Sequence, residues 1–310
     1  MMSTIENGPY LHAIGWTVRP EFSVEFAKSD HFARYNSPIQ FLANGDYLLN
    51  DQAGINDLLT PLAPSLMQLS GVARVRSAAK STVFAALLGN SLLGLITGDV
   101  EYCGEQVGLA VTSSAITSIA WEFESVGLQR GWLKTDTMLL PSAIPSAICT
   151  QVSAALNIHA SATAFQDGAL GLCAAFELAY LSFIHDRAQY FMLIGAEELC
   201  EVQHRALIAI DENRPMLDGA TGILLTKKPR SKADWQLVLC DNIASSAAMV
   251  LPSSWEKVSP FKLQFPSHLA IFSSLLVPYA LQEALSAESD KVLFVCEIPR
   301  QGSYVLGFQR

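Results

Sequence analysis

The stretch Ser161-Ala162-Thr163-Ala164-Phe165-Gln166-Asp167-Gly168-Ala169-Leu170 is the turn on which the predicted fold depends. Before it, residues 156–160 form the run Leu-Asn-Ile-His-Ala, whose apolar and small side chains predict a buried strand. After it, apolar or small residues recur at helical spacing from Leu170 to Ile184. The stretch is therefore predicted to be a sharp turn from a strand into a helix.

A turn of this kind is a common position for an enzyme's nucleophile. The first N–H groups of a helix have no partner within the helix, and their partial positive charge lowers the pKa of a thiol placed beside them. Here the tip carries Phe165 and Gln166, and neither Cys, Ser nor Thr occupies it. The sequence predicts the shape of an active site whose nucleophile is missing.

Composition limits the class of function. Half of the 310 residues are hydrophobic, only 16% are charged and the mean hydropathy is +0.28, which indicates a deep core or a large surface buried against a partner. The formal net charge of -9 argues against a nucleic-acid partner. The apolar runs 83–97 and 269–281 are too short or too interrupted to span a bilayer, and the start of the chain does not resemble a signal peptide, so we expect a cytoplasmic protein.

The six cysteines share no paired spacing, and we predict buried free thiols with neither a metal site nor a cofactor. Alternating strand and helix patterns predict an α/β fold with a mainly buried sheet. Strands are expected at residues 10–18, 106–111, 189–196, 218–226, 235–240, 291–297 and 303–309, beside the strand at 156–160. Helices are expected at 60–69, 74–93, 115–131, 146–156, 170–184 and 266–286, while 19–50 are read as irregular and 139–145 as a loop.

Several segments, in this order, resemble the β-ketoacyl synthases of the thiolase fold. They are residues 106–114, the proline-bearing loop Leu-Pro-Ser-Ala-Ile-Pro-Ser-Ala at 140–147, the strand into the elbow at 154–164, Leu-Ile-Gly-Ala-Glu-Glu-Leu at 193–199, and Asp-Gly-Ala-Thr-Gly-Ile-Leu-Leu at 218–225. The resemblance implies a single thiolase-like domain over residues 1–310 with a layered αβαβα fold. Residues 1–230 would be its ketosynthase-like half, and residues 231–310 an abbreviated C-terminal half.

The departures from that family concern its chemistry. A ketosynthase of the family uses a Cys at the elbow and two His residues in its C-terminal half. Matching Leu170 to the family's Leu puts Gln166 at the nucleophile position, whereas matching Thr163-Ala164 puts Phe165 there. A Gln at this place is similar to the chain-length factors of type II polyketide synthases, which are ketosynthase-like subunits that pair with a catalytic ketosynthase. The segment ending at His268 resembles a family histidine motif, but its spacing is one residue too long.

The resemblance implies further roles. Trp121, Phe123 and Trp132 match the segment that closes the end of the partner's acyl tunnel in chain-length factors, with ordinary core aromatics as the alternative. A strand pairing across a two-fold axis would involve Ile158, His159, Ala160, Ser161, Ala162 and Thr163, and its alternative role is that of an ordinary central strand. Acyl carrier protein, itself acidic, is expected to dock on the catalytic partner, because the net charge of -9 would repel it.

Two hypotheses of different classes follow. The first is a non-catalytic chain-length-factor-like subunit that pairs with a ketosynthase and helps to shape the acyl or polyene tunnel in type II polyketide biosynthesis, with the small aryl-polyene factors as the subclass it resembles. The second is a stand-alone malonyl-thioester decarboxylase or acyltransferase that uses Gln166. An amide at a helix start is able to hydrogen-bond an acyl carbonyl, but the alternative is that Gln166 only fills the vacated pocket.

Overall fold

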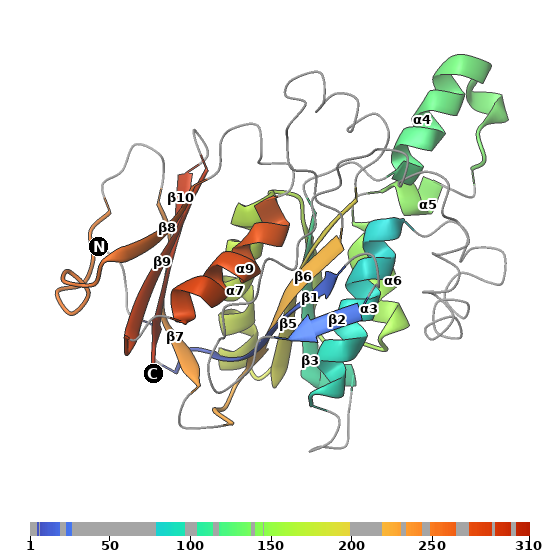
Figure 1. Ribbon diagram of the computed structural model, residues 1–310. Coiled ribbons are helices and arrows are strands. Elements are labelled where there is room, and N and C mark those ends of the chain that lie inside the picture. The colour runs from blue at the N-terminus through green and yellow to red at the C-terminus, as the bar shows by residue number, and fades with distance from the viewer. Residues whose placement is uncertain are drawn as a thin grey trace.

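One mixed β-sheet runs through the described part of the chain in the computed structural model of the protein (Figure 1). The structure describes residues 5, 7–18, 23–26, 79–96, 104–113, 118–137, 140–144, 146–198, 219–230, 234–243, 249–264, 273–286, 289–298 and 302–310. Within these ranges the sheet has ten strands in the order β4-β3-β5-β6-β1-β7-β10-β9-β8, and β2 pairs with β1 beside this path.

The strands are β1 Tyr10–Val18, β2 Ser23–Phe26, β3 Val107–Thr112, β4 Ala162–Phe165, β5 Tyr190–Glu197, β6 Gly219–Thr226, β7 Trp235–Ile243, β8 Pro260–Gln264, β9 Lys291–Ile298 and β10 Gly302–Gln309. The helices are α3 Lys80–Gly94, α4 Ser118–Arg130, α5 Leu140–Ala143, α6 Ala147–Ala155, α7 Gly168–Ile184 and α9 Ser273–Leu285. The short 3-10 helices are η3 Gly104–Gln106 and η4 Trp132–Lys134.

The two ends of the sheet repeat one pattern. In the first half β3 is parallel to β5, β5 is antiparallel to β6, and β6 is antiparallel to β1. In the second half β8 is parallel to β9, β9 is antiparallel to β10, and β10 is antiparallel to β7. The division of the domain after residue 230 remains a proposal, which this repeat supports because residue 230 lies between β6 and β7.

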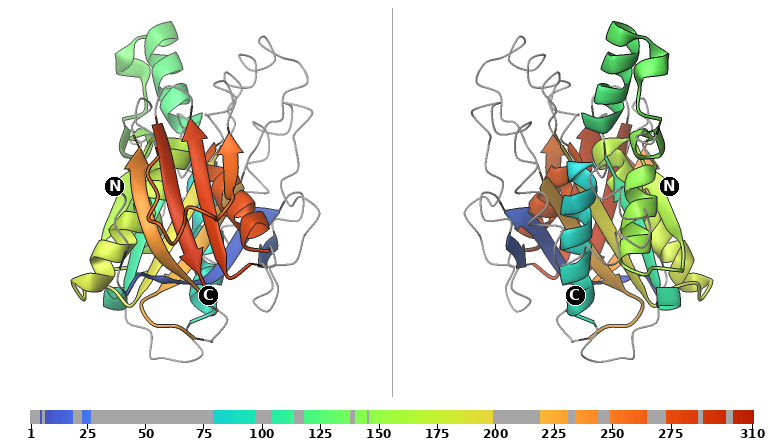
Figure 2. Two further views of the ribbon diagram at one scale, coloured as in Figure 1. Left: turned by 90° about the vertical axis from the view of Figure 1, so that its left-hand side faces the viewer. Right: turned by 90° about the vertical axis from the view of Figure 1, so that its right-hand side faces the viewer.

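Helices and strands alternate in layers across the molecule. Figure 1 shows, from one side to the other, the strands β9 and β10, the helices α7 and α9, the strands β5, β6 and β3, and the helices α3 and α6. In Figure 2 the C-terminal strands accordingly lie toward the viewer in the left view, and α3 lies toward the viewer in the right view. Among the described residues, the outer face of β9 and β10 is covered by the segment around the buried Trp255, which packs on Leu293 and Val305.

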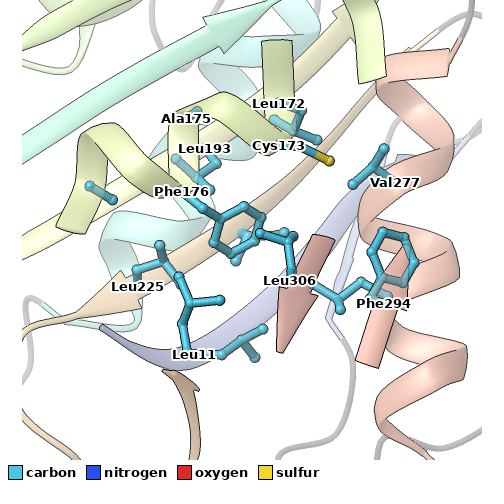
Figure 3. Packing of buried hydrophobic residues seen from close by; sticks show 14 of the residues in the cluster. Leu11, Leu172, Cys173, Ala175, Phe176, Leu193, Leu225, Val277, Phe294 and Leu306 are labelled. Carbon is cyan, nitrogen blue, oxygen red and sulfur yellow. The ribbon is translucent and has the colours of Figure 1, made fainter. Parts of the chain in front are cut away.

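The sheet is apolar on both faces because both are covered, which explains the nearly continuous apolar run of β5. Phe191 and Leu193 face the cluster formed with α7 and α9, while Met192 and Ile194 face the cluster formed with α3 and α6. The ring of Phe176 on α7 lies among side chains from both halves of the sheet (Figure 3). Helix α7 is therefore a central element that is covered by strands on both sides.

The strand predicted at residues 156–160 is wrong. Asn157 takes a left-handed φ of 53°, the Asn157 amide donates to the Ala154 carbonyl at 3.2 Å, and the Ile158 amide donates to the Ser153 carbonyl at 2.7 Å. This is the pattern of a Schellman motif, so Ile158 is the buried apolar residue that closes α6, and the strand begins later, at Ala162.

Other predicted helices and strands differ from the structure or fall outside the described residues. The loop predicted at 139–145 contains the helical turn α5, β2 lies within the stretch read as irregular, and β8 was not predicted. The helix predicted at 60–69 lies outside the described residues. The remaining predicted strands, and the helices that became α3, α4, α6, α7 and α9, are present with shifted ends.

Candidate elbow site

The elbow stands at the carboxyl ends of three parallel strands. Strand β3 lies between β4 and β5, and Thr112 at its end is level with Phe165 on one side and Gly195 on the other. In open α/β sheets ligands bind at this edge, where the chain leaves the strands. The predicted strand-to-helix turn is therefore confirmed, and it lies where a site is expected.

The chain passes from β4 into α7 through Gln166 and Asp167. The turn is made by Gly168, which has a left-handed φ of 53°, and the Thr112 hydroxyl donates a 3.0 Å hydrogen bond to the Gly168 carbonyl. Helix α7 needs Gly171 one turn later, because a Cβ there would lie 2.8 Å from the Phe165 Cβ and 2.9 Å from the Thr112 Oγ1. The elbow is thus a tightly packed and fixed structure.

The tip of the elbow carries an amide and a carboxylate. Gln166 and Asp167 are exposed, and Phe165 is half-buried. Asp167 is the N-cap residue of α7, but its side chain makes no capping hydrogen bond. Its negative charge stands where the partial positive charge of the helix start is favourable for it. The exposure of Gln166 argues against the interpretation that its side chain fills a closed pocket.

The histidines of the described chain do not reach this tip. His159 precedes β4 and His185 follows α7, so both stand at the far ends of the two elements that form the elbow. His12 lies on β1, where its Nε2 is 3.2 Å from the Arg230 guanidinium, and burial together with that charge lowers its pKa. His31, His204 and His268 lie outside the described residues.

The described cysteines do not lie at the tip. Cys173 is fully buried on α7, and a hydrogen bond with Cys296 together with burial raises its pKa. Burial also raises the pKa of Cys149 to about 11 and that of Cys240 to about 12. Thiols with such pKa values are protonated near neutral pH and are poor nucleophiles. The prediction of buried free thiols is confirmed for Cys149, Cys173 and Cys296, and Cys240 is partly buried.

The two acidic residues at the end of β5 were not predicted to be site residues. Glu197 and Glu198 are 0% and 1% exposed, although carboxylates are seldom buried unless they are bound. Glu197 accepts hydrogen bonds from the hydroxyls of Ser113, at 3.2 Å, and Ser274. The signal was present in the sequence, as two adjacent acidic residues that directly follow a fully apolar strand.

Glu198 turns to the opposite face of the sheet. Its Oε2 accepts the Ser81 amide at 2.9 Å and the Ser81 hydroxyl at 3.3 Å, in the first turn of α3. Neighbouring side chains of a strand point to opposite faces, so the two carboxylates bind different helices. Within the described residues no group of three or more His, Cys, Asp or Glu side chains is placed to hold a metal ion.

The predicted tunnel aromatics lie on an arm that projects from the body of the molecule. Helix α4 and η4 form this arm, which follows β3 in the chain and therefore begins from the same edge as the elbow (Figure 1). The rings of Phe123 and Trp132 lie 5.9 Å apart and hold the arm together. Trp121 also belongs to α4. Trp132 is 56% exposed, so it is not an ordinary core aromatic in this chain.

The residues predicted to form an interface strand are only partly in a strand. Ala162 and Thr163 belong to β4, whereas Ile158, His159, Ala160 and Ser161 form the connection that leads into it. Strand β4 is the first strand of the sheet order, with β3 as its neighbour. Its four residues are half-buried or exposed, unlike the fully buried β3 and the residues of β5 after Tyr190.

Known proteins resemble this chain in structure. Neither the known protein-family profiles nor the curated protein sequences match it. The ishigamide ketosynthase/chain length factor superposes with a TM-score of 0.58 at 10% identity, over 97% of this chain and 99% of that chain. A type II polyketide synthase ketosynthase, solved with its acyl-carrier protein and bound to the hexaketide, gives 0.57 at 11% identity, over 84% of this chain and 95% of that chain.

A β-ketoacyl synthase from Burkholderia phymatum STM815 gives a TM-score of 0.57 at 12% identity, over 77% of this chain and 84% of that chain. At these identities the similarities establish the fold. The chain has the thiolase-like α/β fold of ketosynthases and chain length factors, as the sequence predicted. None of its described helices is long and apolar enough to cross a membrane.

Proposed function

We propose that this chain is a non-catalytic subunit, similar to a chain-length factor, that pairs with a catalytic ketosynthase in type II polyketide biosynthesis. The observation that carries the proposal is the elbow. It has the packed strand-to-helix turn of a nucleophile site, but its tip is Gln166, and none of the described thiols or imidazoles lies beside it. A subunit with this fold and no nucleophile at its elbow is able to take part in condensation if another chain supplies the catalytic residues.

Among the described residues only β3 pairs with β4, and the other edge of β4 favours pairing with another chain. The Ser161 carbonyl accepts the amide of Leu109 on β3 at 2.8 Å, and the Phe165 carbonyl accepts the amide of Ser113, directly after β3, at 3.2 Å. Backbone groups alternate in direction along a strand, so those of Ala162 and Ala164 point away from β3. Neither proline nor charge protects this edge.

The opposite edge of the sheet is built differently. Strand β8 begins with Pro260 and carries Lys262, which is 46% exposed and lies 3.4 Å from Glu297. Proline and lysine are typical devices that keep an edge strand from pairing with other chains. The contrast favours β4 as the interface strand.

Exposed apolar side chains also occur on and beside the arm. We call them the apolar arm surface: Leu128, Trp132, Leu133, Leu140 and Ile144, which are 75%, 56%, 101%, 48% and 50% exposed. They lie on α4, η4 and α5 or, for Ile144, directly after α5, and α5 leads to α6, which packs against β4. Apolar patches of this kind mark interaction sites. In the proposed complex the arm lies against the partner, and Trp121, Phe123 and Trp132 help to close its acyl tunnel.

Carrier protein is proposed to reach the complex through the partner. The formal net charge of -9 repels an acidic carrier protein on average, so docking on the catalytic subunit is favoured. The aryl-polyene subclass remains part of the proposal.

One observation supports a second candidate function. Gln166 is exposed at the start of α7, where its amide is able to donate to an acyl carbonyl. A stand-alone decarboxylase or acyltransferase that uses Gln166 is therefore the alternative to be tested.

Co-expression with the ketosynthases encoded beside it, followed by size-exclusion chromatography, tests the proposal. We expect a one-to-one complex whose condensation activity is lost when the partner's elbow cysteine is replaced and is retained in Gln166→Ala. Turnover of malonyl or acyl thioesters by this chain alone, abolished by Gln166→Ala, would contradict it and favour the second candidate.

A further inference from the structure

The last hydrogen bond between β3 and β4 depends on Ser113. Strand β4 has four residues, and the Ser113 amide donates to the carbonyl of Phe165 at the end of β4, next to Gln166. A short edge strand frays easily unless its ends are held. Whatever fixes Ser113 therefore also fixes the carboxyl end of β4 and the start of the elbow.

Ser113 is fixed by the buried carboxylate of Glu197. The Ser113 hydroxyl donates to Glu197 Oε2 at 3.2 Å, and the Ser274 hydroxyl, in the first turn of α9, donates to Oε1. Glu197 is 0% exposed, and leaving a buried polar group without its hydrogen-bond partner is costly. Strand β5 and helix α9 thereby anchor the residue that holds β4.

We propose that Glu197 and Ser113 are positioning residues, which hold the end of β4 and the elbow in the form that the partner ketosynthase meets. This inference rests on the proposed pairing through β4. Neither residue needs to touch the partner, because both act through the Ser113–Phe165 backbone bond. Ser274 binds the same carboxylate, but it belongs to α9 and, within the described chain, makes no bond to β4.

The chain offers a matched pair of variants. Ser113→Ala and Ser274→Ala each remove one hydroxyl donor from the same carboxylate, but only the first breaks the connection to β4. Ser274 is fully buried and Ser113 is half-buried, so we expect Ser274→Ala to lower the melting temperature at least as much as Ser113→Ala. A purely structural role would then make Ser274→Ala the more harmful variant in every assay.

The positioning role predicts the opposite order at the elbow. In the isolated chain, hydrogen exchange of the Ser113 amide should accelerate on the order of tenfold in Ser113→Ala, as expected when a buried group loses one hydrogen-bond partner. Affinity for the co-expressed ketosynthase should fall by a similar factor. Ser274→Ala should change neither, and Ser113→Thr, which keeps the hydroxyl, should restore both.

A second matched pair tests the carboxylate. Glu197→Gln and Glu198→Gln alter adjacent acidic residues of equal burial, but Glu198 binds the Ser81 amide and hydroxyl of α3 instead. Only Glu197→Gln should affect exchange at Ser113. Equal effects of both members of either pair on hydrogen exchange at Ser113 would overturn the inference. A wild-type chain that binds no ketosynthase would overturn the proposed pairing instead, and exchange in the isolated chain would still decide the role of Glu197.

Discussion

Proline substitution along β4 separates the interface from the fold. Ala162 is exposed and its backbone groups point to the open edge, whereas Thr163 lies between the carbonyls of Ser161 and Phe165, which accept from β3. Ala162→Pro therefore removes a donor that only a partner would use. Thr163→Pro removes one from the ladder with β3.

The expected magnitudes follow from these positions. In the complex, an acceptor left without its donor costs about 1–3 kcal/mol, so Ala162→Pro should weaken association by about 5- to 150-fold. In the isolated chain the same variant should change the free energy of unfolding by no more than about 0.5 kcal/mol, as is usual for surface positions. Thr163→Pro should lower the free energy of unfolding of the isolated chain by about 1–3 kcal/mol.

Titration calorimetry with the partner measures the first effect, and urea unfolding of the isolated chain measures the second. The assignment of β4 as the interface strand is refuted if Ala162→Pro binds the partner as well as the wild type does. It is equally refuted if the two proline variants destabilise the isolated chain by the same amount.

Three further predictions concern the fold and its buried groups. Phe176→Ala should lower the free energy of unfolding by about 3–5 kcal/mol, because the 0% exposed ring packs edge-on against Phe308, with ring centroids 5.9 Å apart. A loss below about 1 kcal/mol in urea unfolding would contradict the position of α7 between two layers of strands. Gly171→Ala should lower the free energy of unfolding by about 1–3 kcal/mol, since the new Cβ would lie 2.8 Å from the Phe165 Cβ. Gly94→Ala, whose new Cβ would have no atom within 4 Å, should be neutral or stabilising. Equal melting temperatures of the two variants would contradict the tight elbow. Burial raises the pKa of Cys149 from 9.0 to about 11, so the free energy of unfolding should fall as the pH rises from 9 to 11, where the unfolded thiol ionises and the folded one does not. Cys149→Ala should reduce the slope of that free energy against pH by about 1.4 kcal/mol per pH unit. An unchanged slope in unfolding titrations would argue against a buried thiol.

Much of the fold could be predicted from sequence because its signals are local. The continuous apolar run of β5 and the helical spacing after Leu170 each report a covered sheet and a buried helix, and both predictions are confirmed. The strand at 156–160 was wrong because Ile158 is apolar for another reason, namely the closing contact of a Schellman motif. Apolar character alone does not distinguish these two uses.

The site could be predicted in outline only. The elbow and the absence of a nucleophile at its tip could be predicted from residues 161–170 alone, since both depend only on neighbouring residues in the chain. The bonds of Glu197 were not, because Ser113 and Ser274 are 84 and 77 residues away along the chain. The contrast between the two sheet edges likewise depends on strand order, which no single segment encodes.

Hydrogen exchange along β4, with and without the co-purified ketosynthase, tests the central claim most directly. The claim predicts that the amides of Ala162 and Ala164 exchange freely in the isolated chain and become protected in a one-to-one complex. The amide of Thr163, which faces β3, should be protected in both states. Unchanged exchange at Ala162 and Ala164 in a complex that has formed would contradict pairing through β4.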